Sequence, residues 1–584
     1  MSWTRVYWVV ALVAAVALAL SFGLHYGMSN QQTYLIHALV RFDPTLFPND
    51  WYAREAADIH SMWSRVAALL LSIHDGPEHL VAIELVLTVV GCLAIAWLVR
   101  AALPDPREAL PVLLGWYALA FVSRTIDVMG SFLFAGYLQP SSFGEAGILI
   151  AAACLAHRRH VTFGVALALG GLLHLNFLAL GLASLGLAQL ALTPRWPALG
   201  FGAWLRELLP RLARAFALPL LVFLWALPQF LVAAKTGSAE ATRIVVEIRA
   251  PHHFQPTWEA LAPFLAWQGA GWLALLARRW SRVRDQAADA IWDTLLPLHA
   301  GVGGFVVVCA AVATALHVDL VLQLFPFRFA PLASVIAAVA VLGCGVTAAL
   351  RGATWPAWCG LGLAGAVLAS WGVAPEQRVW VFALGALVAV AAALRVLLAR
   401  RRPPQPAQQR VPVPALEGAL VTAGLAACLT IAAAWTPLGA FAPRIHALPQ
   451  RQRALVQWVR TTTELDDVFL VPPSLGTFRM FARRSVVVDW KSAGAYGTDI
   501  LEWYRRINRV AGHRVRKRTH ADKGYARMDR ARAEELRREF GVRYLVLQKP
   551  RAPGAPVDIG AVAFENGAYV VYRLDGPAPP PGTP

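Results

Sequence analysis

Charge is scarce in this sequence. Only 15% of its 584 residues are charged, whereas 57% are hydrophobic and the mean hydropathy is +0.51. Ordinary soluble globular domains carry about 25% charged residues, so the composition excludes that class. The chain is therefore expected to lie in a lipid bilayer.

Polar residues are also rare inside the apolar stretches, which are continuous and rich in Leu, Ala and Val. The strands of a porin-like barrel would alternate polar and apolar residues, so that class is excluded. A transmembrane helix needs roughly 20 apolar residues, and runs of that length recur from Val6 to Trp435. This recurrence excludes an enzyme with a single anchor and predicts a polytopic α-helical membrane protein.

Cysteine is infrequent and never forms a CxxC pair. All the cysteines lie in apolar runs, where they are typical of core packing rather than of disulfides or metal sites. They are Cys92, Cys154, Cys309, Cys344, Cys359 and Cys428. The sequence also lacks a clustered set of metal ligands, so it leaves a divalent metal open without predicting one.

Acidic residues are outnumbered. The chain has 35 Asp and Glu against 53 Lys and Arg, which gives a net charge of +18. In a membrane protein this excess has a simple source, because cytoplasmic loops collect Lys and Arg. No nucleic-acid partner is therefore predicted, and the expected partners include membrane lipids.

A window of roughly 20 residues finds about 13 candidate transmembrane helices. They lie at 6–24, 79–99, 110–126, 141–156, 161–176, 177–193, 215–234, 259–277, 289–316, 330–350, 356–372, 378–399 and 414–435. Basic residues gather in alternate connections, which predicts a cytoplasmic N-terminus in the inner (cytoplasmic) membrane and, because the count is odd, an extracytoplasmic C-terminal region. The run 161–193 is split at His174 and Asn176. A single helix there would reverse the orientation of everything that follows.

The predicted membrane domain covers residues 1–436 and includes a first outer loop at 25–78. After Pro437 the pattern predicts a small extracytoplasmic α/β domain over 437–575, followed by a disordered Pro-rich tail at 576–584. Its short β-rich runs lie at 468–471, 485–488, 544–547 and 569–572, and its helices are expected within 446–463, 499–510 and 521–540.

The first outer loop contains two aspartates in a rigid setting. Asp43 and Asp50 lie in the segment 41–52, which also holds two prolines and four aromatic residues. The next segment, 56–73, is too short and polar to cross, so we expect a helix that rests on the membrane surface. A carboxylate at this interface can act as a general base.

Further polar residues are predicted on the outer side, where few arginines are expected. Arginine forks match phosphate oxygens bidentately, so these residues predict a site for a lipid phosphate. The candidates are Arg124, Asp127, Gln139, His174, His252, His253 and Arg328, with Arg243 and Arg249 in the loop that holds the two histidines.

This arrangement resembles the GT-C superfamily of polytopic glycosyltransferases, in particular its bacterial members. The resemblance covers the whole architecture. It rests on Asp43 and Asp50 after the first helix, Gln139-Pro140 before a span, and the later Phe327-Arg328. In the C-terminal region it extends to Pro472-Pro473, Asp489-Trp490-Lys491 and Glu502-Trp503-Tyr504-Arg505.

The resemblance implies an inverting transferase that moves a sugar from a polyprenyl phosphate to an acceptor on the outer face of the membrane. It implies Asp43 or Asp50 as the base, with Arg328 and Arg124 on the phosphate. Asp489 and Lys491 would contact the acceptor or the lipid head group. The acceptor would be a glycan, a lipid or a protein.

Each candidate also has a structural alternative. Asp43 can form a turn before Pro44, and Asp50 can cap a helix that starts near Trp51. The remaining alternatives are an ion pair between Arg124 and Asp127, snorkelling of Arg328 to the interface, and a satisfied His174 between helices.

Two other functions stay open at this stage. A transporter or flippase of lipid-linked glycans would need charged or broken helices along a path at the membrane midplane. A non-catalytic scaffold of an envelope glycan assembly would not need Asp43 or Asp50.

Overall fold

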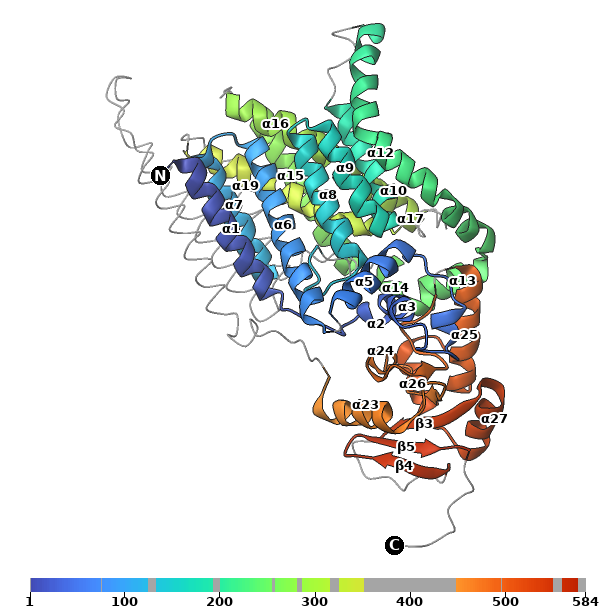
Figure 1. The fold of residues 1–584 in the computed structure, drawn as a ribbon. Helices are drawn as coiled ribbons and strands as arrows, with labels where there is room; N and C mark the ends of the chain where they lie inside the picture. The colour runs from blue at the N-terminus through green and yellow to red at the C-terminus, as the bar shows by residue number, and fades with distance from the viewer. Residues whose placement is uncertain are drawn as a thin grey trace, which may run out of the picture.

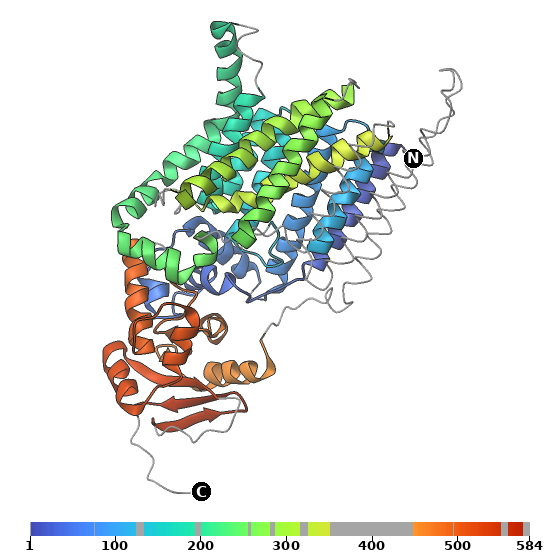
Figure 2. The same cartoon turned by 180° about the vertical axis from the view of Figure 1, so that it is seen from behind.

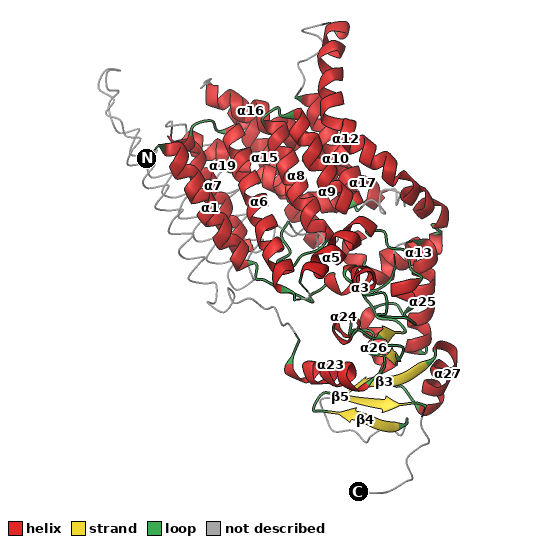
Figure 3. Cartoon of the chain, in the orientation of Figure 1, coloured by secondary structure: helices red, strands yellow, loops and turns green. Residues whose placement is uncertain are grey.

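The chain is mostly helical, with a small sheet near its C-terminus (Figures 1 and 3). The computed structural model describes residues 2–74, 76–123, 133–192, 200–254, 258–280, 286–315, 325–350, 448–494, 496–549 and 559–575. Candidate residues Arg124 and Asp127 lie outside these ranges, as do the predicted spans 356–372, 378–399 and 414–435.

The first half of the chain forms a helical bundle. Its helices are α1 (Trp3–Ser21), α6 (Glu78–Ala102), α7 (Pro106–Ser123), α8 (Pro140–Ala156), α9 (His160–Leu173), α10 (Leu175–Ala191), α12 (Phe201–Thr236), α15 (Trp258–Trp280), α16 (Gln286–Leu298), α17 (Gly304–Ala315) and α19 (Ala330–Leu350). Among the described residues, five segments are long and apolar enough to cross a membrane: Trp3–Ser21, Glu78–Ala102, Phe201–Val232, Ala290–Ala313 and Pro326–Thr347. The polytopic helical class is therefore confirmed, whereas the number of spans stays a prediction.

Small residues allow the bundle helices to approach closely. A methyl group on Gly147 of α8 would lie 2.9 Å from the Cα atom of Gly170 in α9. Helices in membranes pack through such glycine contacts because lipid supplies no hydrophobic force between them. The predicted break near His174 is confirmed, since α9 ends at Leu173 and α10 begins at Leu175.

The loop between α1 and α6, called the first loop here, contains four short helices at one end of the bundle (Figure 1). They are α2 (Gln31–Tyr34), α3 (Ile36–Phe42), α4 (Trp51–Arg54) and α5 (Ser61–Ile73). On α5, Trp63 and Ala67 are buried, whereas Leu69 and Ile73 are 64% and 73% exposed. Apolar residues on the exposed side fit the expected helix on a membrane surface.

A second connection joins the bundle to the C-terminal region. It consists of α13 (Ala239–Arg243), the π-helix η1 (Ile244–Arg249) and α14 (Pro251–Phe254), and both α13 and η1 contact α25 (Gly497–Ala511). Seen from behind, this green segment lies beside the orange α25 (Figure 2). The short 3-10 helix η3 (Pro326–Phe329) leads into α19.

The C-terminal region, residues 448–575, has a five-stranded sheet of order β2-β1-β3-β5-β4. Its strands are β1 (Val468–Leu470), β2 (Ser485–Val486), β3 (Val542–Gln548), β4 (Ala561–Glu565) and β5 (Tyr569–Arg573). β2, β1 and β3 are parallel, whereas β3, β5 and β4 are antiparallel, with Leu545 opposite Tyr572. The four predicted β-rich runs are confirmed as strands, and β4 was not predicted.

The helices of this region are α23 (Gln450–Thr462), α24 (Thr477–Ala482), α25, α26 (Arg518–Tyr525) and α27 (Arg530–Phe540). A single helix over 521–540 is wrong. The side chain of Asp529 accepts a hydrogen bond from the Arg532 amide at 2.9 Å, which caps a new helix at Arg530.

The first loop and the C-terminal region share one hydrophobic core, in which Phe47 and Trp51 belong to the same cluster as Val487 and Trp503. The bundle has a separate core. A shared core fixes the first loop against the C-terminal region, so polar groups at this contact are held in place.

Candidate functional site

Asp43 lies on the surface of the first loop. Its Oδ1 atom accepts hydrogen bonds from both the Thr45 amide, at 2.9 Å, and the Thr45 hydroxyl, at 2.6 Å. These bonds hold the pKa of Asp43 below its usual value. The turn predicted at this aspartate is therefore present, and the carboxylate is ionised at neutral pH.

Asp50 lies at the contact between the first loop and the C-terminal region. Its Oδ1 atom accepts from the Ala53 amide at 3.0 Å and so caps α4, as the structural alternative predicts. Its Oδ2 atom accepts from the Val486 amide at 2.8 Å and from Nε of Arg479 at 2.7 Å. Both oxygens are engaged inside the protein, so these contacts favour a structural role, and the catalytic role stays a prediction.

Arg328 and His174 lie together at the end of the bundle. Nη1 of Arg328 donates to Nε2 of His174 at 2.7 Å, and its guanidinium also stacks over Phe325. Within the described residues no carboxylate lies within ion-pairing distance of Arg328. A half-buried guanidinium with a neutral partner can bind an anion.

A column of rings connects this arginine to the first loop. The His174 ring lies 4.8 Å from that of His60, and the His60 ring lies 4.9 Å from that of Tyr34. Burial and the neighbouring Arg328 lower the pKa of His60 to about 3, so the ring is neutral. In the described part of the chain, Nδ1 of His60 and Nδ1 of His174 have no hydrogen-bond partner.

A second group of cations, called the Arg249–Lys491 cluster here, lies where η1, the first loop and the C-terminal region meet. Nη2 of Arg249 donates to the Lys491 carbonyl at 2.9 Å, and Nζ of Lys491 lies 3.4 Å from both Ser29 Oγ and Asn30 Oδ1. Nε of Arg249 is buried without a hydrogen-bond partner. His252 lies within electrostatic reach of both cations.

The charge of this cluster is not neutralised by ion pairs. Among the described residues, no carboxylate lies within ion-pairing distance of Arg249 or Lys491. Burial, Arg249 and Arg518 lower the pKa of Lys491 to about 8, which Asp489 opposes. Closely spaced cations without counter-ions are the arrangement expected of a phosphate-binding site.

Other predicted residues surround these groups. Gln139 is buried before α8, and its Oε1 atom accepts from Asn30 at 3.1 Å. The ring of His253 lies 4.1 Å from that of His252. Asp489 is buried and pairs with Arg479. The structure thus brings His252, Lys491 and Gln139 to the first loop near Ser29 and Asn30, and it does not bring Asp50 to Arg328.

Sequence reasoning missed two glutamates, Glu84 of α6 and Glu145 of α8. Both are buried, and the carboxyl of Glu145 lies within electrostatic reach of Glu84 and Arg328. The signal was available, because an ionisable residue inside an apolar helix marks a functional site by default. Arg479 was also missed, and nothing in its sequence context identifies its distant partner.

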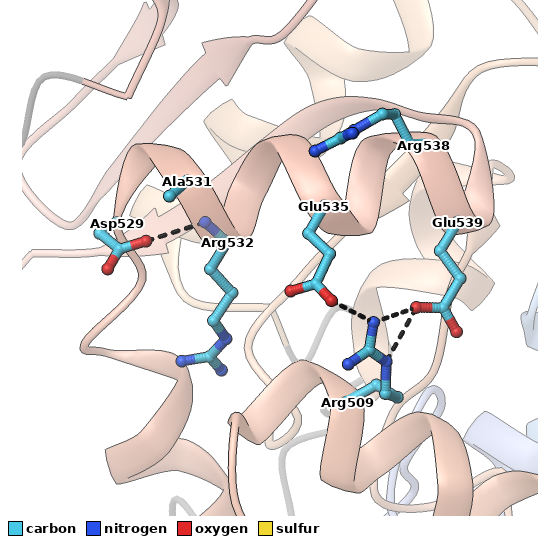
Figure 4. Close-up of a pocket in the computed structure, with 7 residues that line it drawn as sticks. All are labelled: Arg509, Asp529, Ala531, Arg532, Glu535, Arg538 and Glu539. Carbon is cyan, nitrogen blue, oxygen red and sulfur yellow. Dashed lines mark hydrogen bonds and ion pairs between the residues drawn. The ribbon is translucent and has the colours of Figure 1, made fainter.

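No group of three or more metal-ligating side chains occurs in the portion of the chain that the structure describes. A surface hollow of about 780 Å³ lies between α25 and α27 (Figure 4). There Arg509 is already paired with Glu535 and Glu539 at 2.6 Å, so its lining charges neutralise one another. The hollow therefore lacks the uncompensated charge of the Arg249–Lys491 cluster.

Comparison with known proteins finds three similarities. Residues 450–510 match a domain of unknown function, DUF6798. No curated protein matches the sequence. The chain is similar to the crystal structure of ArnT from Cupriavidus metallidurans bound to undecaprenyl phosphate, with 15% identity, and to its apo structure, with 16% identity. In both cases the TM-score is 0.46, and the similarity covers 98% of this chain and 99% of ArnT. ArnT is a GT-C glycosyltransferase, the superfamily that the sequence motifs resemble.

Proposed function

We propose that the protein is an integral-membrane glycosyltransferase that takes its sugar from a polyprenyl phosphate. The observation that carries this proposal is the Arg249–Lys491 cluster, in which two cations without ion-pair partners face the first loop. A lipid phosphate supplies the missing negative charge, and the apolar helices beside it accommodate an isoprenoid tail. The titles of the ArnT structures add a neighbour that binds undecaprenyl phosphate.

The proposed reaction is a single displacement. The acceptor hydroxyl oxygen forms a bond to the anomeric carbon while the bond from that carbon to the phosphate oxygen breaks, which inverts the configuration. The leaving phosphate gains negative charge, and preorganised cations stabilise such charge in the transition state. Arg249 and Lys491 fill this role, and His252 lies beside them.

The proton of the acceptor hydroxyl must move to a base. Asp43 is exposed and ionised, and it is the aspartate of the first loop whose carboxylate is not buried in an ion pair. Glu145 is a second choice, because it lies near Arg328 at the end of the bundle. Arg328 and His174 then bind the acceptor or a second oxygen of the donor.

In the proposed orientation the first loop and the C-terminal region face outward from the cytoplasmic membrane. Residues 1–436 then form the membrane domain, and 437–575 form an extracytoplasmic domain. The acceptor is a glycan, a lipid or a protein that approaches from the outer side. Both cation groups lie at the first-loop end of the bundle, which supports one site on one side of the membrane.

A transfer assay in liposomes tests the function. Purified protein should release polyprenyl phosphate from a lipid-phosphate sugar only when an acceptor fraction is present, whereas a flippase would move the lipid without consuming acceptor. Of Asp43→Asn and Glu145→Gln, the variant that removes the base should lower turnover by about 10²–10⁴-fold with donor binding retained. Full turnover in both variants would remove both carboxylates from the mechanism, and release without acceptor dependence would contradict the transferase.

Donor affinity should fall at alkaline pH. Lys491 binds phosphate as an ammonium, and its pKa of about 8 reflects burial together with Arg249 and Arg518, opposed by Asp489. The donor phosphodiester keeps one negative charge throughout, and burial keeps the pKa of His252 below its usual value, so that ring is already neutral. Between about pH 7 and pH 9 the protonated fraction of Lys491 drops about tenfold, and affinity should drop with it.

This dependence is measured by titrating nanodisc-embedded protein with donor at several pH values. Lys491→Met is the matched control, since it should bind weakly and show no pH dependence in that interval. An equal alkaline loss in Lys491→Met would assign the titration to another group.

A further inference from the structure

Arg479 of α24 is a buried arginine that joins two separate parts of the chain. Its side chain is 1% exposed, and it forms ion pairs with Asp50 of the first loop and with Asp489 of the C-terminal region. Nη1 also donates to Ser492 Oγ at 2.6 Å. A buried guanidinium is tolerated only when it is paired in this way, so the three segments are held together.

Asp489 in turn shapes the backbone that follows it. Its Oδ1 atom accepts from the Lys491 amide at 2.7 Å and from the Ser492 amide at 2.8 Å. Its own carbonyl accepts from Nε1 of the buried Trp503 at 2.9 Å. The turn at 489–492 therefore depends on the position of one carboxylate, and Arg479 holds that carboxylate.

Lys491 leaves this turn toward the substrate-binding cations. Its carbonyl accepts from Arg249, and its ammonium faces Ser29 and Asn30 of the first loop. We propose that Arg479 is a positioning residue, which through Asp489 holds Lys491 in the Arg249–Lys491 cluster and through Asp50 ties that placement to the first loop. The inference rests on the proposed function in that the cluster is taken as the phosphate site.

The proposal gives a role to the segment that matches a domain of unknown function, since Arg479, Asp489 and Lys491 all lie within residues 450–510. In this chain that segment supplies a substrate-binding cation together with the ion pairs that orient it. The C-terminal region therefore completes the site, because the bundle and the first loop alone lack Lys491.

A purely structural arginine provides the matched control. Arg484 is 5% exposed and lies near Arg479 in the sequence. It donates to the Thr463 hydroxyl at 3.1 Å and to the Thr463 carbonyl at 2.6 Å, and its hydrogen bonds within the described residues involve neither the first loop nor the turn at 489–492. Arg484→Gln thus removes a buried guanidinium without touching the support of Lys491.

The test measures the environment of Lys491 directly, without donor. Full-length protein in nanodiscs is labelled with an amine reagent over a pH series, and labelling of each lysine is read by mass spectrometry. In the wild type Lys491 should have a midpoint near pH 8, because burial and Arg249 lower its pKa to about 8. Lys517 and Lys523, which are exposed, serve as internal references.

In Arg479→Gln, release of Lys491 into solvent should raise its midpoint toward the ordinary value of about 10.4, which is a roughly 100-fold change in the protonation equilibrium. Arg479→Lys and Asp489→Asn, which keep the volume of the site, should shift it in the same direction and keep the test valid if Arg479→Gln does not fold. Arg484→Gln should leave the midpoint unchanged.

An unchanged midpoint in the folded Arg479 and Asp489 variants would overturn the proposal, as would an equal shift in Arg484→Gln. A second arm adds a polyprenyl phosphate to the nanodisc, which should protect Lys491 of the wild type from labelling. If protection fails while the midpoint still shifts in the Arg479 variants, the proposed phosphate ligand is wrong and the positioning role stands.

Discussion

Replacing Asp50 by alanine should lower the free energy of unfolding by about 3–5 kcal/mol, because the variant leaves the buried guanidinium of Arg479 without one of its two carboxylates. Asp50 also caps α4 and accepts from the Val486 amide, so two further hydrogen bonds are lost. The apparent melting temperature of purified protein in detergent measures this effect.

Asp43→Ala is the control for this experiment. Asp43 lies on the surface and bonds only to Thr45 among the residues for which contacts are described, so its loss should change stability by about 1 kcal/mol or less. The comparison also tests the catalytic assignment. If Asp50→Ala melted like the wild type and nevertheless lost turnover, Asp50 would have to act in the chemistry and not in the ion pair.

Replacing Arg249 by methionine should weaken binding of a polyprenyl phosphate by about 2–4 kcal/mol, or roughly 30- to 1000-fold. The guanidinium has a buried Nε atom without a hydrogen-bond partner and no carboxylate within ion-pairing distance in the described structure. Removing an uncompensated, half-buried charge should leave the melting temperature equal or higher. Loss of affinity with retained stability identifies a ligand-binding arginine.

Arg243→Met provides the matched control for affinity. Arg243 precedes the same π-helix, but it is paired with Glu240 at 2.7 Å and with Glu247 at 3.5 Å. Its replacement should leave lipid-phosphate binding within about twofold. Equal losses of affinity in the two variants would point to a general effect of net charge instead of a defined phosphate site, and salt would then abolish both.

The helical positions were predictable because each depends on local composition. Apolar runs of sufficient length predict the bundle helices, and the polar pair His174 and Asn176 predicts the break between α9 and α10. The β-rich runs at 468–471 and 544–547 become strands for the same reason. β4 was missed because Ala561–Glu565 is a short edge strand with a mostly half-exposed pattern.

The site was only partly predictable. Lys491 and His252 were named from their expected location, and the structure places them beside Arg249. The partner of Asp50 could not be named, because no local pattern reports which residue a folded chain brings to a buried carboxylate. Glu84 and Glu145 were overlooked although charge inside an apolar helix is costly and therefore informative.

Asp50 and Arg479 are separated by 429 positions. At a synthesis rate of about 5–20 residues per second, roughly 20–90 s pass between the appearance of the aspartate and that of the arginine. Until then α4 and its neighbours lack their lasting support, and the ribosome has yet to deliver the lysine. A chain that stops before Arg479 leaves an inert bundle with a frayed loop, a natural target for membrane proteases. Completion of translation and maturation of the site are therefore the same late event.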